Sequence, residues 1–447
     1  MKKEIKEIKK KQFQLVKGMK DLLPEEQNYW FYLEDLVNKI ANKYSFQKIS
    51  TPILENAELF KRSVGAITDI VEKEMYNFID KGGESVSLRP EFTAGIARAY
   101  IEHGMLNLPQ PVKLYSSGPC FRYDKPQAGR YRQFQQFNFE IIGEADAICD
   151  AQVILAAYKI YQTVNLPVVI QINSIGCPQC RPEYENVLRD HFKRHRSKLS
   201  EVSQKRLVKN VLRILDSKEK EDQDYLKEVP QQVDYLCDDC RQHFFQVFEY
   251  LDELEIPYAL NPRIVRGLDY YTRTTFEIVA ANDEEKILEL GGGGRYDGLI
   301  ELLGGRATPA VGFAAGVERL INIIKEQKIA IPETAKPDVF LAQLGTDARK
   351  RALTLFEELY DVGIKVTEDL AKSGLKAQLE QANKLGVKYS LILGQKELID
   401  GTIMIRDMEG GIQEVVDAKK IISEIQKRLE KAKVDINRIG NNQKVGE

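Results

Sequence analysis

The sequence predicts a multidomain protein of mixed α+β and α/β class, and three observations support that prediction. Residues 113–143 alternate apolar and polar side chains with the period of two that is typical of β-strands. Residues 176–260 hold a basic helical stretch between two Cys-x-x-Cys pairs. From residue 338 onwards, short apolar runs alternate with helical patterns, as in a small α/β domain. The length of 447 residues is compatible with about three domains.

Composition excludes several classes of protein. Hydrophobic residues make up 43% of the chain and charged residues 30%, which is typical of globular proteins. The net charge of -2 argues against a nonspecific nucleic-acid coat protein, which would be strongly basic. No run of about 18 apolar residues predicts a membrane span, and no apolar signal core follows the Lys-rich N-terminus. We therefore expect a cytoplasmic enzyme.

The charge is unevenly distributed along the chain. Residues 1–20 carry a net charge of +6 and residues 189–220 carry +7, so the remaining 395 residues carry -15. The near-neutral total therefore does not exclude a local basic face.

A helix is predicted to begin after Pro24. Proline fits the first helical turn, and Glu25 and Glu26 place negative charge at the positive end of the helix dipole. The apolar residues that follow recur at helical spacing: Trp30, Leu33, Leu36, Val37 and Ile40.

Two strands are predicted within residues 113–143, joined by the polar loop KPQAGRYRQ. In the second strand Phe137, Phe139 and Ile141 share one face. Alternation places Gln136, Asn138 and Glu140 on the other face. This polar face could be the floor of a cleft, but a solvated sheet face explains the same alternation.

The two cysteine pairs have the chelate spacing of zinc ligands: Cys177, Cys180, Cys237 and Cys240. However, 56 residues separate the pairs, and packing of reduced, metal-free thiols accounts for them equally well. The remaining cysteines and the four histidines form no pattern that predicts nucleophilic Cys/His catalysis.

Four arginines lie beside glycines or aromatic residues in strand-like contexts: Arg122, Arg130, Arg266 and Arg319. Guanidinium groups suit phosphate oxygens, although a salt bridge is the ordinary explanation for any single one. The run GGGGRYDG would let backbone approach a ligand closely, yet a glycine run alone more often predicts a turn or bulge. No P-loop or strand-borne G-x-G-x-x-G motif is present. PAVGFAAGVERL predicts a short strand that runs into a helix.

Longer segments carry a resemblance to a known family. FRYDKPQAGRYRQFQQFNFEIIGE resembles motif 2 of the class II aminoacyl-tRNA synthetases, AVGFAAGVERL resembles motif 3, and TPILENAELFKRSVGAITDIVEKEMYNF resembles the region around motif 1. RGLDYYTRTTFEI and GGGGRYDGLIELLGG are similar to the two signatures of histidyl-tRNA synthetases, which are far more specific than the class motifs. The resemblance extends from KGMKDLLP to about residue 425.

The resemblance implies a fold and a division of the chain. An antiparallel sheet flanked by helices would form the catalytic core, in two parts at residues 1–175 and 261–325. A mainly helical insertion at 176–260 would approach the tRNA acceptor arm. A linker at 326–337 would lead to an α/β anticodon-binding domain at 338–425, and we expect a flexible tail at 434–447.

The implied activity is the ATP-dependent ligation of L-histidine to histidine tRNA through a histidyl-adenylate. ATP and Mg²⁺ would be required, and the chain would form a homodimer through the motif 1 region, with no membrane contact. Zinc at the four paired cysteines stays an open alternative.

The resemblance also implies roles for individual residues. Arg122, Arg266 and Arg319 would be catalytic cations at the phosphates, and Arg130 and Gly316 would complete the ATP site. Residues that would bind histidine are Glu91, Thr93, Gln136, Glu140, Tyr270, Tyr271 and Tyr296. Gln127 and Arg132, in the motif 2 loop, would lie near the first base pair of the acceptor stem.

Three departures from the family pattern stand out. Phe92 occupies a position that usually holds a small residue and is expected to narrow the amino-group end of the pocket. KGMKD replaces the more usual RGTKD. Ser200 and Ser203 stand where related insertions often carry another cysteine pair.

Two other functions compete with the enzyme. One is a non-catalytic paralogue, either a regulatory subunit for the first enzyme of histidine biosynthesis or the tRNA-sensing domain of a kinase. The regulatory subunit lacks an anticodon-binding domain, and sensing paralogues usually have degenerate catalytic positions. The other is a general nucleic-acid binder, which would bind with a steep salt dependence and no amino-acid requirement.

Overall fold

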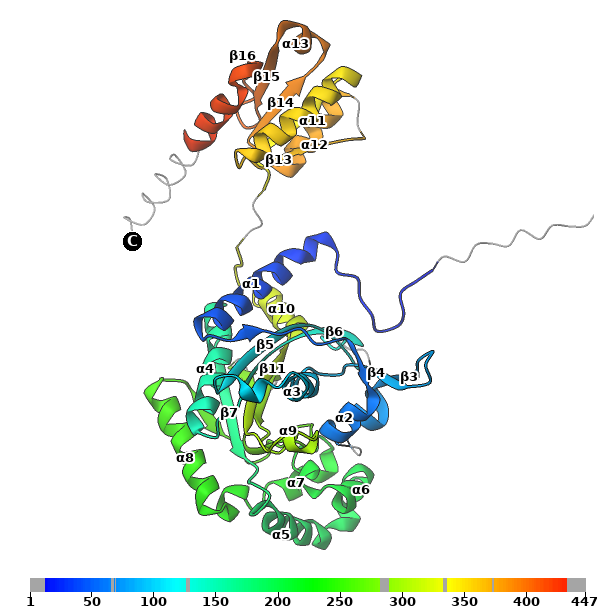
Figure 1. Ribbon diagram of the computed structural model, residues 1–447, viewed down its shortest axis with the longest axis vertical. Coiled ribbons are helices and arrows are strands. Elements are labelled where there is room, and N and C mark those ends of the chain that lie inside the picture. Colours follow the sequence, from blue (N-terminus) through cyan, green and yellow to red (C-terminus); the bar gives the residue numbers. More distant parts are fainter. Residues whose placement is uncertain are drawn as a thin grey trace, which may run out of the picture. The chain divides into compact units, whose positions relative to one another are not determined.

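The structure, a computed structural model, describes residues 13–65, 68, 70–125, 129–281, 289–332, 336–371 and 374–431. The chain divides into two compact units with the boundary after Pro332 (Figure 1). No helix in the described part of the chain combines the length and the apolar character that a membrane span requires.

An eight-stranded sheet forms the centre of the first unit, in the order β1-β5-β6-β11-β10-β9-β7-β8. Its strands are β1 (Gln47–Lys48), β5 (Val112–Phe121), β6 (Gln133–Ile142), β7 (Val168–Ser174), β8 (Tyr258–Leu260), β9 (Thr272–Ala280), β10 (Glu289–Arg295) and β11 (Ala310–Gly316). All neighbours are antiparallel except β1 with β5 and β7 with β8. This confirms the predicted fold class of the core.

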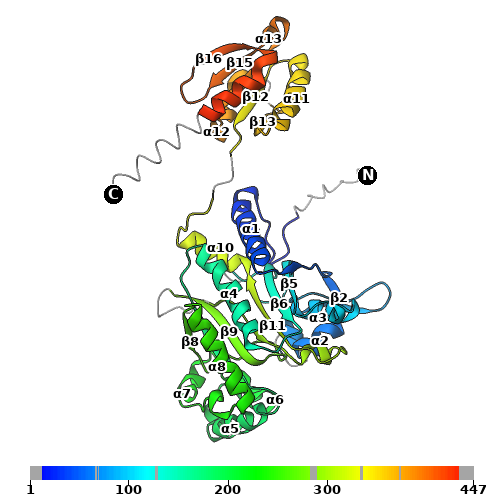
Figure 2. The same cartoon turned by 60° about the vertical axis from the view of Figure 1, so that its left-hand side comes forward.

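Helices cover one face of this sheet (Figure 2). They are α1 (Gln27–Lys43), α4 (Ala147–Thr163), α8 (Asp238–Glu253) and α10 (Val317–Glu326). A short 3₁₀ turn, η1 (Pro24–Glu26), precedes α1, so the predicted helix start after Pro24 is confirmed. The predicted apolar stripe of α1 is buried at Leu33, Leu36, Val37 and Ile40.

The opposite face carries shorter elements and a second apolar cluster. The elements near it are α3 (Thr93–Glu102), η3 (Met105–Asn107), α9 (Leu299–Leu302) and α2 (Ala57–Val64) with η2 (Ile70–Glu74). A small antiparallel sheet of order β2-β4-β3 joins them, made of β2 (Leu54–Asn56), β3 (Tyr76–Ile79) and β4 (Ser85–Leu88).

The hairpin predicted within residues 113–143 is confirmed as β5 and β6. Phe137, Phe139 and Ile141 are buried among the helices, as alternation predicts. The polar face is buried too, because Gln136 is only 6% exposed and Glu140 1%. Buried polar side chains exclude the alternative of a solvated sheet face, so this face is part of an interior site.

The glycine run is not a turn, which is one of the two structures that such a run ordinarily predicts; the other is a bulge. Gly291–Gly294 lie inside β10, between β9 and β11 at the centre of the sheet. The pairing with β9 shifts register before Gly291 and after Gly294, so irregularities flank the run. The close-packed neighbouring strands leave no room for larger side chains here.

The insertion is built from short helices, as predicted. They are α5 (Arg181–Arg194), η4 (Arg196–Lys198), α6 (Glu201–Lys209), η5 (Val211–Ile214), η6 (Lys220–Asp222), α7 (Gln223–Leu226), η7 (Gln232–Tyr235) and then α8. The last of these, α8, packs against α4 in the core of the main sheet. The boundaries at residues 176 and 260 stay a prediction.

The serines noted in the insertion have a structural role. The hydroxyls of Ser200, Ser203 and Ser217 lie 2.9, 2.5 and 2.5 Å from Asp222 Oδ2, and each donates to it. The Ser200 backbone N–H donates to Oδ1 of the same carboxylate. A fully buried aspartate therefore ties three turns of the insertion together.

The second unit is a five-stranded sheet of order β13-β12-β14-β15-β16. Its elements are β12 (Val339–Gln343), α11 (Thr346–Asp361), β13 (Val366–Glu368), α12 (Leu375–Leu385), β14 (Tyr389–Leu393), α13 (Gln395–Asp400), β15 (Thr402–Asp407), β16 (Gln413–Asp417) and η8 (Ala418–Lys420), followed by helical residues 421–431. The predicted β/α alternation is confirmed up to β14. The antiparallel pair β15 and β16 was not predicted. Residues 434–447 lie outside the described residues.

Candidate active site

A cleft of about 500 Å³ opens on the polar face of the main sheet. It lies over β6, β10 and β11, at the start of α3 and beside the segment that precedes β9. Most of the residues predicted to bind ATP or histidine line it: Glu91, Thr93, Arg122, Arg130, Gln136, Arg266, Tyr270, Tyr271, Tyr296, Gly316 and Arg319. Segments nearly 230 residues apart in the sequence thus meet in one site.

Glu140 lies beneath the floor of the cleft, where three donors hold its carboxylate. Thr93 Oγ1 and Asn138 Nδ2 donate to Oε1 at 2.7 and 2.8 Å, and the Tyr296 hydroxyl donates to Oε2. Burial raises the pKa of Glu140 to about 7, although these hydrogen bonds favour the charged form. The carboxyl is therefore a preorganised acceptor at the closed end of the cleft.

Glu91 caps α3 from inside the cleft. Its carboxylate accepts from the backbone N–H groups of Thr93 and Ala94, at 2.5 and 2.8 Å. Burial raises the pKa of Glu91, and the two backbone donors oppose that shift. A buried carboxylate fixed in this way can accept a further hydrogen bond from a cationic ligand group.

Arg266 projects across the cleft from the loop before β9 and is held by two carboxylates. Its Nη1 lies 2.7 Å from Glu277 Oε1 and 3.0 Å from Glu289 Oε1. Burial alone would lower the pKa of the guanidinium, but Glu289, Tyr271 and Glu277 together raise it. Arg266 Nε is buried and has no hydrogen-bond partner among the residues that the structure describes. The cation is thus charged, positioned and able to donate to a ligand.

Two glycines are required by close contacts in this site. A Cβ added to Gly312 would lie 1.6 Å from Glu140 Oε2, and one added to Gly292 would lie 2.5 Å from Arg266 Nη1. Both distances are far shorter than the van der Waals radii of the atoms allow. The glycines therefore make space for the acceptor Glu140 and for the cation Arg266.

Three other arginines of the predicted set line the cleft. Arg122 Nε donates to the Pro90 carbonyl oxygen at 2.9 Å, and Arg319 Nη1 donates to the Glu289 carbonyl oxygen at 2.7 Å. Arg130 pairs with Asp124 at 3.2 Å. Three cations besides Arg266 therefore face one cavity, a concentration of positive charge that suits a polyphosphate.

The remaining predicted residues lie elsewhere. Arg132 stacks on the Tyr123 ring, 3.6 Å from its centroid, at the edge of the motif 2 loop. Gln127 falls outside the described residues. Phe92 does not line the cleft; its ring is buried under Arg89, 4.0 Å from the guanidinium carbon. The expectation that Phe92 narrows the pocket is wrong, because the strand-to-helix turn directs its ring into the core.

Comparison with known proteins decides the family. The sequence model of histidyl-tRNA synthetase matches residues 18–320, and that of an anticodon-binding domain matches residues 338–428. The chain belongs to the histidyl-tRNA synthetase family.

Curated relatives and a solved structure agree with this assignment. The histidine–tRNA ligase of Dehalococcoides mccartyi is 46% identical over 418 residues, which cover 93% of this chain and 100% of the relative. That of Desulforamulus reducens is 45% identical over 413 residues, covering 92% and 98%. The apo crystal structure of S. aureus histidyl-tRNA synthetase is 36% identical, has a TM-score of 0.78 and covers 93% of this chain and 100% of that one.

The family assignment confirms the predicted resemblance and the architecture of a synthetase core with a C-terminal anticodon-binding domain. A structure described as an ATP phosphoribosyltransferase regulatory subunit/histidyl-tRNA synthetase is also similar, at 21% identity and a TM-score of 0.59, and shows the shared fold alone.

Sequence reasoning missed several polar residues of the cleft. Glu277 and Glu289 fix Arg266, and Asp216, Arg213 and Glu318 also line the cavity. Burial raises the pKa of Glu318 to about 7. One signal was available, because Glu277 lies between Phe276 and Ile278 in a strand and alternation places it opposite those buried residues. No comparable signal marks the others.

Proposed function

We propose that the cleft catalyses the ATP-dependent joining of L-histidine to histidine tRNA through a histidyl-adenylate. The observation that carries this function is that cations and a buried acceptor meet at one cavity. Arg122, Arg266 and Arg319 line it, and Tyr296, which also lines it, donates to the buried carboxylate of Glu140. A polyphosphate and an imidazole can therefore bind side by side. The test is the formation of acid-stable histidyl-tRNA from labelled histidine, which requires both ATP and histidine tRNA.

The first step joins the histidine carboxylate to the α-phosphorus of ATP. A carboxylate oxygen attacks phosphorus, the bond to the bridging oxygen breaks, and pyrophosphate leaves with its electron pair. Negative charge concentrates at the phosphoryl oxygens in the transition state, so fixed cations accelerate the step. Arg122 and Arg266 would hold the α-phosphate, while Arg319 holds the γ-phosphate. Mg²⁺ enters as part of the ATP substrate.

Histidine would lie along the floor with its two polar ends satisfied. Glu91, Gln136 and Thr93 face the α-amino group, and Glu140 accepts the imidazole N–H. A side chain that cannot donate to Glu140 would lose this buried hydrogen bond, at a cost of about 1–3 kcal/mol. Selectivity for histidine therefore follows from Glu140, an acceptor that the fold buries before the amino acid binds.

The second step transfers the histidyl group to tRNA. A ribose hydroxyl at the 3′ end attacks the carbonyl carbon, and AMP leaves from the mixed anhydride. The open side of the cleft, next to Arg130 and the motif 2 loop with Arg132 and Gln127, admits the acceptor end in this proposal.

Regulatory and sensing functions are less well supported. The anticodon-binding domain matched at residues 338–428 is what the regulatory subunit lacks. The predicted cations and the carboxylates Glu91 and Glu140 are all present in the cleft region. We place the protein in the cytoplasm as part of the same proposal, since histidine tRNA is used in translation there.

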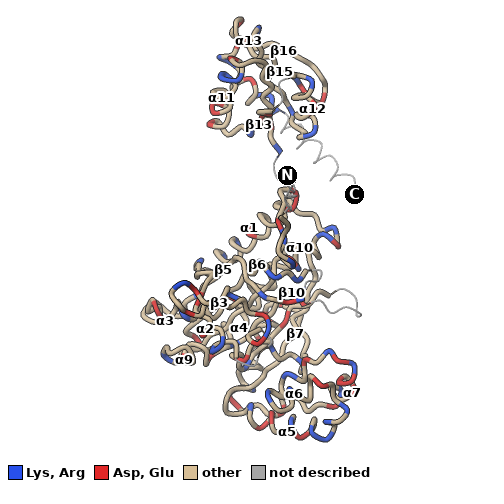
Figure 3. The backbone as a smooth tube through the Cα atoms, turned by 90° about the vertical axis from the view of Figure 1, so that its right-hand side faces the viewer, with Lys and Arg blue, Asp and Glu red and all other residues tan. Residues whose placement is uncertain are grey.

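The insertion is expected to contact the tRNA acceptor arm electrostatically. Lys and Arg positions follow one another along the helices α5 and α6, interspersed with acidic positions (Figure 3). Reversing three exposed cations (Arg194→Glu, Arg196→Glu and Lys198→Glu together) should weaken tRNA binding by about tenfold or more. The slope of log affinity against log salt should fall by about 3. Filter binding at several salt concentrations measures both.

The matched control reverses two exposed lysines near α1, Lys39→Glu and Lys48→Glu. Both sets of variants should keep histidine-dependent adenylate formation. Unchanged tRNA affinity in the triple variant would contradict the assignment of the insertion to tRNA binding.

The motif 1 region is expected to form a homodimer interface. Its small sheet exposes apolar side chains, with Leu54 43% and Phe78 46% exposed. A stable association would bury these surfaces, and a charge at the centre of an apolar interface is costly. Phe78→Glu should raise the dimer dissociation constant by about tenfold or more. Light scattering after size exclusion measures the mass of the particle.

The control for the dimer is Ile399→Glu, since Ile399 is 78% exposed in the C-terminal unit. This variant should remain dimeric. A wild-type particle with the mass of one chain at micromolar concentration would overturn the dimer.

A further inference from the structure

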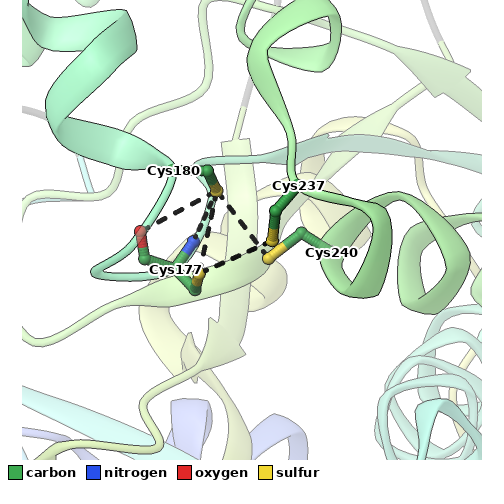
Figure 4. A group of neighbouring side chains, drawn as sticks. All are labelled: Cys177, Cys180, Cys237 and Cys240. Atoms are coloured by element: carbon green, nitrogen blue, oxygen red, sulfur yellow. Dashed lines mark hydrogen bonds between the residues drawn. The ribbon is translucent and has the colours of Figure 1, made fainter.

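We propose that Cys177, Cys180, Cys237 and Cys240 bind one zinc ion, which fixes the loop behind Tyr271 in the histidine pocket. The four sulfur atoms lie within 4.8 Å of one another (Figure 4). One pair follows β7 and the other begins α8, so the metal would close the insertion at its base.

The distances between the sulfurs fit tetrahedral coordination. Zn²⁺ at about 2.3 Å from each of four tetrahedral sulfurs requires neighbouring sulfurs about 3.8 Å apart. The Sγ atoms lie 3.7 Å apart between Cys177 and Cys180, 3.8 Å between Cys177 and Cys237, and 3.9 Å between Cys180 and Cys240. All four are free thiols. The arrangement matches a single Zn²⁺ better than it matches two disulfides, whose bonded sulfurs would be about 2 Å apart.

The surroundings of the sulfurs resemble those of structural zinc sites. Cys180 and Cys240 are buried, at 6% and 0% exposure, and the other two are half-buried. The Cys177 backbone N–H donates to Cys180 Sγ at 3.3 Å. Cys180 and Cys237 are the N-cap residues of α5 and α8, where the helix dipole favours a negative sulfur. Backbone donors and dipoles of this kind stabilise the charge of a tetrathiolate centre.

Simple packing of reduced thiols is a weaker explanation. The other two cysteines, Cys120 and Cys149, are buried separately in the fold as ordinary apolar residues. In contrast, two pairs 60 residues apart in sequence bring all their sulfurs to one point. Apolar packing does not require sulfur atoms to face one another, whereas coordination does.

The loop that carries the first pair is bonded to the histidine pocket. Arg181, next to Cys180, donates from Nη2 to the Tyr271 carbonyl oxygen at 2.7 Å and to the Gly176 carbonyl oxygen at 3.1 Å. The Thr272 hydroxyl and the Arg273 backbone N–H also donate to the Gly176 oxygen, at 3.2 and 2.9 Å. Fixing this loop by a metal therefore fixes the backbone of Tyr271, whose side chain lines the cleft.

The first experiment needs no variant. Full-length protein is purified without a chelator and without a histidine tag. Its metal content and its free thiols are then measured. We expect about one zinc per chain, and six reactive thiols once the protein is unfolded in the presence of a chelator. Replacement by Co²⁺ should give the intense thiolate-to-cobalt absorption of a tetrahedral sulfur site. Less than 0.1 metal per chain, or a disulfide within the four cysteines, would overturn the proposal.

Variants then locate the metal. Cys177→Ser and Cys240→Ser should each lower the zinc content at least fivefold after dialysis against a weak chelator, while Cys149→Ser should retain it. If Cys149→Ser loses zinc as readily as the other two, the assignment to the four-cysteine site is wrong. If Cys177→Ser and Cys240→Ser both keep full zinc, the assignment is likewise overturned.

The positional role is measured separately and rests on the proposed function. In pyrophosphate exchange, Cys177→Ser should raise the KM for histidine about tenfold and change kcat by less than about threefold. Circular dichroism checks that the variant is folded. If Cys177→Ser loses zinc but keeps the wild-type KM for histidine, the assignment of the metal site holds and the effect of the metal on Tyr271 is refuted. A wild-type protein with zinc but without exchange would refute the proposed function and not the site.

Discussion

Replacing Arg266 with alanine is expected to lower the kcat of histidine-dependent ATP–pyrophosphate exchange by about 10²- to 10³-fold. In the proposed mechanism, Arg266 supplies a fixed positive charge where the α-phosphate gains negative charge. Two carboxylates, Glu277 and Glu289, hold the guanidinium in place before substrate arrives, so little reorganisation is needed. Stopped-flow or steady-state exchange measures the loss.

Histidine binding should change far less in this variant. The predicted histidine ligands Thr93, Gln136 and Glu140 lie on α3 and β6, whereas only Tyr270 and Tyr271 share the segment before β9 that carries Arg266. Equilibrium dialysis with labelled histidine should therefore give a dissociation constant within about threefold of wild type. Arg266→Lys keeps the charge but loses the planar fork, and we expect it to recover only part of the rate.

Removal of Arg266 leaves Glu277 and Glu289 unpaired, so the fold needs a control. The double variant Arg266→Ala/Glu289→Gln removes one of these two unpaired charges and should melt at a higher temperature than Arg266→Ala while remaining slow. A rate near wild type in Arg266→Ala would show that the α-phosphate charge is neutralised elsewhere and that the assigned role is wrong.

Glu140→Gln is expected to raise the KM for histidine by about 100-fold. Glutamine has nearly the same shape but is a weaker acceptor, and its amide N–H₂ would face either the donors Thr93 and Asn138 or the Tyr296 hydroxyl. The imidazole would lose its charged acceptor in a water-poor pocket. Exchange assayed at rising histidine concentrations measures the shift.

A matched control makes the same substitution on the surface. Glu102→Gln removes a carboxylate from the end of α3 that pairs with Arg98, outside the cleft. Its KM should stay within about twofold of wild type. Equal KM values for the two variants would remove Glu140 from the histidine site.

Much of this architecture could be predicted from local sequence patterns. Alternation in β6 separates Phe137 and Phe139 from Gln136 and Glu140, because strand geometry fixes which side chains share a face. The start of α1 after Pro24 follows from local helix chemistry in the same way. Such rules need only neighbouring residues, and the structure confirms them.

Other features depend on contacts between segments that are distant in the sequence, so the neighbouring residues do not predict them. The glycines of β10 look like a turn until the strands on both sides and the side chain of Arg266 are known. Glu289 precedes the glycine run and holds an arginine that lies 23 residues earlier. The convergence of the two cysteine pairs likewise became visible only in three dimensions.

The most direct test of the central claim is ATP–pyrophosphate exchange measured with each of the twenty amino acids in turn. The account predicts rapid exchange with L-histidine and at least about 10⁴-fold lower kcat/KM with every other amino acid. Exchange that is absent with histidine, or that another amino acid supports equally well, would contradict it.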